Sequence, residues 1–134
     1  MQQQELSTAT LRLAFFWYMA GAAMLMVVAI TSLIPVPDIG VSDKFAHFVT
    51  YAMLSGWFSL LVIRRASLGW VVVGLIAYGI TIEGLQGMTD YRFPEWGDVV
   101  ANSAGVLLGT LVFFTPLYRL MRALDLALAG VLKR

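Results

Sequence analysis

The chain has 134 residues, enough for one compact unit, and its composition is that of a membrane protein. Hydrophobic residues make up 60% of it and charged residues 13%, whereas soluble domains carry about 25% charged residues. Nine Lys and Arg against eight Asp and Glu give a net charge of +1, which argues against a nucleic-acid-binding protein, because such proteins present a basic face. The absence of cysteine excludes disulfides, thiolate metal sites and a cysteine nucleophile.

Four segments are long enough and apolar enough to cross a bilayer as helices, which requires about 20 residues each. The first and the fourth carry no charged residue, the second contains His47, and the third contains Glu83 near its end. The segments are residues 13–34, 45–63, 66–86 and 99–118. The sequence therefore predicts an all-α integral membrane protein, a single domain built as a bundle of four transmembrane helices.

Basic residues are distributed unequally between the two sides of this predicted bundle. Seven lie before the first segment, between the second and third, and after the fourth, whereas the other two loops contain only Lys44 and Arg92. Because cytoplasmic loops are enriched in Lys and Arg, we expect both termini in the cytoplasm, in a multi-pass protein of the bacterial inner membrane. The seven residues are Arg12, Arg64, Arg65, Arg119, Arg122, Lys133 and Arg134.

The last segment, residues 119–134, has the pattern of an amphipathic helix. Arg119, Arg122 and Asp125 fall on one helical face, and Leu120 and Leu124 fall on another. This pattern predicts a short interfacial helix on the cytoplasmic leaflet, with its cations near anionic headgroups.

Polar and titratable residues gather at the opposite, outer end of the predicted bundle. In the second segment they recur every four residues and so share one helical face. In the third segment, Glu83 and Gln86 lie about one helical turn inside the outer boundary of the bilayer. In the fourth segment, Asp98 and Asn102 lie at the outer end of one face of the helix. We predict that they form one lipid-shielded ligand-binding cluster: Asp43, Lys44, His47, Tyr51, Glu83, Gln86, Arg92, Asp98 and Asn102.

Glu83 is the most informative member of this cluster, because an unpaired acid near the centre of a membrane helix costs about 2.5–3.5 kcal/mol. It therefore requires protonation or a cationic partner, and the candidates are Lys44, His47 and Arg92. The functional interpretation is a polar cup in which Glu83 pairs with Arg92 or Lys44. The alternative is an ion pair that only fastens the third helix. For His47 the functional interpretation is that the Asp43 carboxylate holds it charged or fixes its tautomer, and the alternative is an interfacial histidine hydrogen-bonded to Asp43 or Tyr51.

Below Asp98 and Asn102 the same helical face continues with Gly105 and Gly109. This spacing of small residues lets two membrane helices approach closely. We expect these glycines to serve helix packing and to direct the polar residues above them into the bundle.

The motif Asp43-Lys44-x-x-His47-Phe48-x-x-Tyr51, followed by Glu83-x-x-Gln86, Arg92 and Asp98-x-x-x-Asn102-x-x-Gly105-x-x-x-Gly109, resembles the VanZ-like family, named for a protein that confers teicoplanin resistance. The resemblance covers roughly residues 35–110. It implies a membrane protein of four or five spans with the motif residues near the outer surface. It implies no defined activity, and we do not transfer the resistance phenotype.

Three functions remain open. The first is binding of an anionic headgroup, such as a polyprenyl phosphate, another cell-envelope lipid precursor or a phospholipid, by Lys44, His47 and Arg92. The second is a small membrane enzyme acting on a lipid phosphate, which is disfavoured because a single histidine cannot serve as both nucleophile and acid. The third is a lipid or proton-coupled transporter. No cofactor is expected. A divalent metal held by Asp43, Glu83 and Asp98 is conceivable, but no recognised metal-ligand spacing supports it, and a homo-oligomer is left open.

Overall fold

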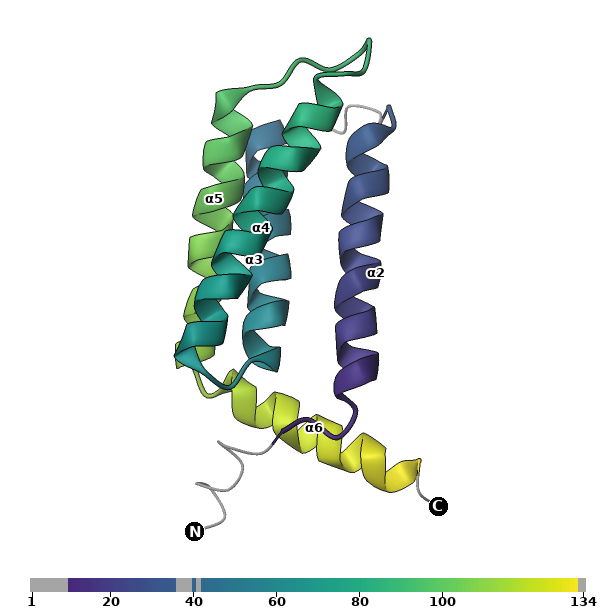
Figure 1. Ribbon diagram of the computed structural model, residues 1–134, viewed down its shortest axis with the longest axis vertical. Coiled ribbons are helices and arrows are strands. Elements are labelled where there is room, and N and C mark those ends of the chain that lie inside the picture. Colours follow the sequence, from purple (N-terminus) through teal and green to yellow (C-terminus); the bar gives the residue numbers. More distant parts are fainter. Residues whose placement is uncertain (1–9, 36–39, 41, 133–134) are drawn as a thin grey trace.

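The computed structural model describes residues 10–35, 40 and 42–132, and the regular secondary structure of this part of the chain is entirely helical (Figure 1). The prediction of an all-α protein is confirmed. Four long helices lie side by side, and a fifth crosses beneath one end of them. In chain order the elements are α2 (Ala14–Leu33), α3 (Asp43–Leu61), α4 (Arg65–Gln86), α5 (Trp96–Thr110), the short 3₁₀ helix η1 (Leu111–Phe114) and α6 (Leu117–Val131).

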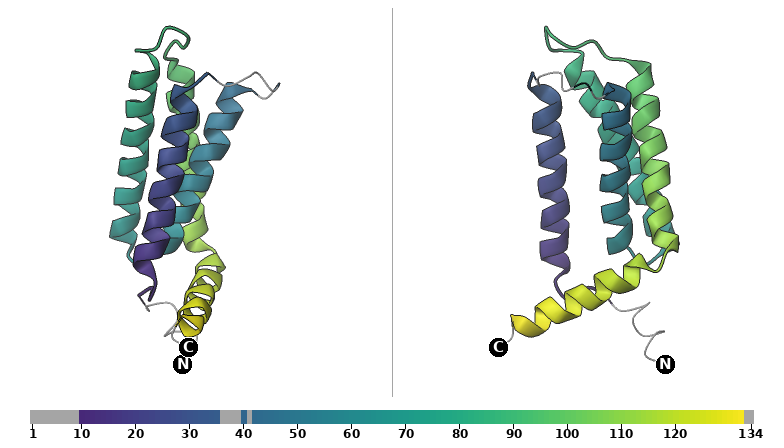
Figure 2. Two further views of the ribbon diagram at one scale, coloured as in Figure 1. Left: turned by 90° about the vertical axis from the view of Figure 1, so that its right-hand side faces the viewer. Right: turned by 180° about the vertical axis from the view of Figure 1, so that it is seen from behind.

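Three helical stretches are individually long and apolar enough to cross a membrane: α2, α4, and α5 together with η1. The helix α3 has 19 residues but is more polar, and it lies in contact with α2, α4, α5 and α6 (Figure 2). Its Ser55 and Ser59 are fully buried, and the Ser55 hydroxyl donates a hydrogen bond to the Val106 carbonyl at 2.7 Å. The polarity of α3 is therefore directed toward other helices.

The distribution of side chains is inverted relative to a water-soluble protein. Large apolar residues such as Phe16 and Trp70 are exposed, while polar residues such as Glu83 and Asn102 are buried. In a bilayer, apolar surfaces face acyl chains and ionisable groups face the bundle interior. The exposed apolar surface is thus the surface expected to contact lipid.

The helices α3 and α5 form the closest pair in the bundle, because two glycines of α5 face the backbone of α3. A Cβ added at Gly105 would lie 2.2 Å from the Phe48 carbonyl oxygen, and one at Gly109 would lie 2.2 Å from that of Ala52. Any side chain at either position would push the two backbones apart. The Gly-x-x-x-Gly motif is therefore used within the chain, against α3, which leaves it unavailable to a second copy.

The fourth segment ends earlier than the predicted residue 118. After Thr110 the helix tightens into η1, which ends at Phe114, and Thr115 is extended with φ −95° and ψ 163°. A proline disfavours helical geometry at the residue before it, so Pro116 accounts for the break. The helix α6 starts immediately afterwards at Leu117.

Of the three charged residues predicted to face water and headgroups on α6, Arg119 is exposed but Arg122 and Asp125 are not. Arg122 and Asp125 are buried at 3% and 2% exposure, whereas Leu120 and Leu124 are exposed. The physical reason is that Asp125 accepts hydrogen bonds from the start of α2: from the backbone N–H groups of Arg12 and Leu13 and from the indole of Trp17, at 2.7–2.9 Å.

This arrangement gives the first turn of α2 a carboxylate cap supplied by a distant helix. The first N–H groups of a helix lack partners within it, and a negative charge there is favourable. Lys133 and Arg134, which entered the sequence argument, lie outside the described residues.

Candidate functional site

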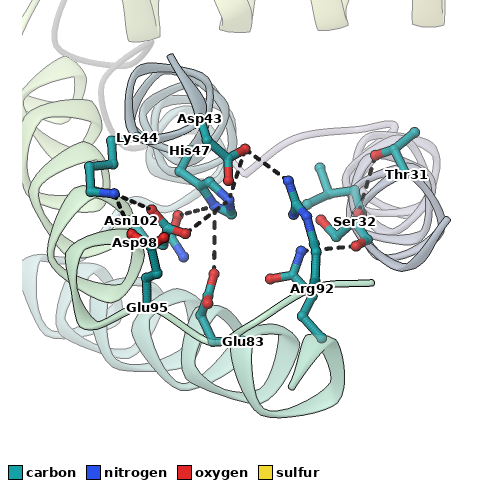
Figure 3. Close-up of polar contacts among 12 residues, drawn as sticks. Thr31, Ser32, Asp43, Lys44, His47, Glu83, Arg92, Glu95, Asp98 and Asn102 are labelled. Atoms are coloured by element: carbon teal, nitrogen blue, oxygen red, sulfur yellow. Dashed lines mark hydrogen bonds and ion pairs between the residues drawn. The ribbon is translucent and has the colours of Figure 1, made fainter. Parts of the chain in front are cut away.

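Polar side chains from α3, α4, α5 and the preceding loop meet at the end of the bundle opposite α6 (Figure 3). Several of them are deeply buried, with Glu83 at 4%, Asp98 at 5% and Asn102 at 1% exposure. We call this group the outer cluster. It consists of Asp43, Lys44, His47, Glu83, Arg92, Glu95, Asp98 and Asn102.

Local structure explains two of these positions. Asp43 lies in the first turn of α3, and Asp98 lies in the first turn of α5. Acidic residues are favoured there because they face the positive end of the helix dipole. The close contact at Gly105 then brings the top of α5 against α3, so that Asp98 and Asn102 face His47.

His47 is at the centre of the outer cluster, and its two ring nitrogens face different partners. Nδ1 lies 3.0 Å from Oδ1 of Asn102 and 3.9 Å from Oε1 of Glu83. Nε2 lies 3.8 Å from Oδ1 of Asp43 and 4.0 Å from Oδ2 of Asp98. The hydrogen bond predicted to Asp43 or Tyr51 is therefore made to Asn102 instead.

Two cations lie at the rim of the cluster. Arg92 donates from Nη2 to Oδ1 of Asp43 at 2.9 Å. Lys44 binds Glu95 and lies 3.7 Å from Oδ1 of Asp98. The predicted pairing of Glu83 with Arg92 or Lys44 is not present, because each of these cations reaches another acid first, and the basic side chain within 4 Å of Glu83 is His47.

Several buried polar atoms in this region have no hydrogen-bond partner. They are the hydroxyl of Tyr51, Oε1 of Glu83, Oδ1 of Asp98 and Nδ2 of Asn102. Buried polar atoms are nearly always hydrogen-bonded in folded proteins, and exceptions often mark a bound water, ion or functional site. Four such atoms around one histidine indicate a binding site for a water molecule, an ion or another ligand.

A cavity of about 180 Å³ opens beside the cluster, between α2 and α3. The charged side chains along it are Asp43, His47 and Arg92. The rest of the lining combines hydroxyl groups with apolar walls: Val28, Thr31, Ser32, Ala46, Thr50 and Tyr51.

Five of the nine predicted residues do not line this cavity: Lys44, Glu83, Gln86, Asp98 and Asn102. Gln86 donates from Nε2 to the Ser32 carbonyl at 2.9 Å, so it joins α4 to the end of α2. Lys44 lies on the other side of His47, toward Glu95 (Figure 3).

Sequence reasoning did not place Glu95 in the cluster, where it pairs with Lys44, and it missed the hydroxyl residues Thr31 and Ser32 of the first helix. A usable signal existed for the latter pair, because two adjacent hydroxyl residues just before Pro35 mark the outer end of an otherwise apolar helix.

One subset of the cluster has the donor types and spacing of a metal site. One ligand atom each from Asp43, His47 and Asp98 lies within 4.8 Å of the others. This grouping is not evident from sequence spacing, because Asp98 comes from a different helix.

Fold and site together define a small helical protein with membrane-compatible helices and an ionisable cluster buried at one end of its bundle. The chain belongs to the VanZ/LLP1 family, whose model matches residues 2–121. This agrees with the resemblance found in the sequence motifs. No curated protein matches the chain, and no solved structure does so.

Proposed function

We propose that the chain is a four-span protein of the bacterial cytoplasmic membrane, with both termini in the cytoplasm, that binds the anionic headgroup of a lipid or cell-envelope precursor. The headgroup occupies the cavity between α2 and α3 at the outer face. Arg92 is its principal cationic contact.

The fourth span in this proposal is α3. With 19 residues and a rise of about 1.5 Å per residue, α3 is about as long as the hydrocarbon layer is thick. Its lower hydropathy is compatible with spanning, because its polar residues contact other helices. The excess of Lys and Arg at the α6 end supports a cytoplasmic location for that end.

The observation that carries the headgroup proposal is the position of Arg92 on the α2–α3 cavity. A guanidinium has five N–H donors, and its contact with Asp43 uses Nη2. Arg92 is 35% exposed, so it can donate to a phosphate while it remains beside Asp43. Hydroxyls of Thr31 and Thr50 line the same cavity and suit the polar oxygens of a headgroup.

The test is lipid retention by purified protein. Wild type, Arg92→Ala and Lys44→Ala are purified in a mild detergent, incubated with undecaprenyl phosphate or phosphatidylglycerol, and measured by native mass spectrometry. We expect Arg92→Ala to reduce retention of the preferred lipid about tenfold. Lys44→Ala is the matched control, because Lys44 does not line the cavity, and we expect it to change retention less than twofold.

The proposal would be contradicted if Arg92→Ala retained as much of each lipid as the wild type does. A loss in Lys44→Ala with none in Arg92→Ala would also contradict it, because the headgroup would then lie on the Glu95 side of His47. Size-exclusion profiles of all three proteins establish that they are folded.

A further inference from the structure

We infer that Asp43, His47 and Asp98 form a binding site for one divalent transition-metal ion, such as Mn²⁺ or Zn²⁺. This inference rests on the geometry of the outer cluster and does not depend on the proposed lipid ligand.

The first argument concerns the protonation of His47. Nδ1 lies at hydrogen-bond distance from Oδ1 of Asn102, and an amide oxygen can only accept. Nδ1 therefore carries the proton, and the nearby Oε1 of Glu83 favours the same tautomer. The lone pair of a neutral imidazole is then on Nε2, which is the nitrogen that faces Asp43 and Asp98.

The second argument concerns distances. The separations of 3.8 Å and 4.0 Å between Nε2 and the two carboxylates are too long for hydrogen bonds. Two ligand atoms that each lie about 2.1 Å from one ion are roughly 3–4 Å apart. The two separations from Nε2 therefore fall in the range found between ligands of one ion, and the three ligand atoms lie within 4.8 Å of one another.

The third argument concerns charge. Four carboxylates of the outer cluster, those of Asp43, Glu83, Glu95 and Asp98, face the two cations Lys44 and Arg92. The carboxyl groups of this cluster thus outnumber its Lys and Arg side chains by two, partly inside the bundle. One divalent ion would neutralise that excess.

An unpartnered buried atom supplies independent support. Asp98 is buried, and its Oδ1, which lies 3.7 Å from Nζ of Lys44, has no hydrogen-bond partner, so the hydrogen bonds expected for a purely structural acid are incomplete. Asn102 and Glu83, on the Nδ1 side of the ring, are placed as the outer partners that orient a metal-binding histidine.

The mixture of ligands favours a transition metal. Imidazole nitrogen suits Zn²⁺, Mn²⁺ and Fe²⁺, whereas Ca²⁺ and Mg²⁺ prefer sites made of oxygen atoms alone. Asp43 and His47 also line the cavity between α2 and α3, through which water or a further ligand would reach the ion.

Metal binding is tested with the ions alone. Detergent-solubilised full-length protein is stripped with EDTA and titrated with MnCl₂ or ZnCl₂ at pH 7.5 by isothermal titration calorimetry. We expect one ion per chain, at least tenfold weaker binding in Asp98→Asn, and unchanged binding in Asp90→Asn, an exposed loop acid outside the cluster.

A spectroscopic measurement on the wild-type protein detects the histidine ligand directly, so the test does not depend on the folding of a variant. Electron spin echo modulation of bound Mn²⁺ should show coupling to one imidazole nitrogen, and this coupling should be absent in His47→Gln. Failure to bind either ion below millimolar concentration would overturn the inference and leave His47 as an imidazolium paired with the acids. Unchanged affinity in Asp98→Asn, or bound Mn²⁺ without nitrogen coupling, would overturn it as well.

Discussion

Buried acids at the two ends of the bundle differ in the hydrogen bonds that they receive. At the α6 end, Asp125 is buried and receives three N–H hydrogen bonds from the start of α2. At the outer end, Glu83 and Asp98 are equally buried, yet each has a carboxylate oxygen without a hydrogen-bond partner. Burial alone therefore does not indicate whether an acid is fully hydrogen-bonded, and the two ends of the bundle differ in the number of donors that reach each buried carboxylate.

One charged side chain at the α6 end is buried without a full set of hydrogen bonds. Arg122 is buried there with Nε and Nη1 unpartnered, and it lines a separate cavity of about 200 Å³. The contrast therefore concerns the acids, for which three donors converge on Asp125 and too few reach Glu83 and Asp98.

The largest expected effect comes from breaking the contact that places the outer cluster. Gly105→Leu would drive a side chain into the Phe48 carbonyl and separate α5 from α3. Because overpacking of this kind costs about 3 kcal/mol or more, we expect most of the protein to be lost from the folded peak in size-exclusion chromatography. Gly84→Leu is the control, since a Cβ at Gly84 meets nothing within 4 Å. Equal loss in both variants would show that the α3–α5 contact is not special.

The next effect tests the α6 end. Asp125→Asn leaves one side-chain oxygen for three donors, so at least one N–H at the start of α2 loses its partner. Because hydrogen bonds to charged groups contribute about 1.5–3 kcal/mol, we expect a loss of about 2 kcal/mol in the free energy of unfolding. Thermal unfolding in detergent measures it. Arg119→Gln, at an exposed position of α6, should change the midpoint little, and a similar decrease in both would count against a specific cap.

Acid should remove the same contribution from the wild type. Burial by itself raises the pKa of Asp125, but the hydrogen bonds from Arg12, Leu13 and Trp17 outweigh it, so the pKa in the folded state lies below its ordinary value. A lowered pKa stabilises the fold at pH values above the unfolded pKa of about 3.9, and this stabilisation is lost as the pH falls through the folded pKa.

The measurement for this prediction is the difference in unfolding midpoint between wild type and Asp125→Asn. We expect it to be constant between about pH 5 and pH 7 and to shrink below about pH 4. A difference that grows on acidification would refute the assigned role.

The smallest effect is expected at the rim of the outer cluster. Lys44 and Glu95 form an ion pair whose side chains are 53% and 59% exposed. Because exposed ion pairs contribute about 0–1 kcal/mol, Glu95→Gln should shift thermal unfolding by no more than its experimental error. A large decrease would mean that Glu95 also has a structural role within the cluster.

The sequence was sufficient to predict the helices because long apolar segments and prolines are local signals. It also indicated which residues gather at the outer end, because i, i+4 spacing places Asp43 and His47 on one face of α3. The sequence could not indicate which of these side chains pair with one another. Whether Arg92 reaches Asp43 or Glu83 depends on the path of the α4–α5 loop, and the tautomer of His47 depends on how far α5 approaches α3 at Gly105.

The buried role of Asp125 was missed for a related reason. Its position among Arg119, Arg122 and the leucines of α6 has the periodicity of a surface helix, and sequence periodicity does not reveal which face meets the protein. Only the return of α6 beneath the first helix brings Asp125 to the N–H groups of Arg12 and Leu13.

The central claim, that the acids of the outer cluster are not retained for stability, is tested most directly by the unfolding midpoint of Glu83→Gln measured beside that of Asp125→Asn in the same detergent. Neutralising Glu83 removes a buried, under-bonded charge, so Glu83→Gln should unfold at or above the wild-type midpoint while Asp125→Asn unfolds well below it. A decrease in Glu83→Gln as large as that in Asp125→Asn would contradict the account and identify Glu83 as a structural acid.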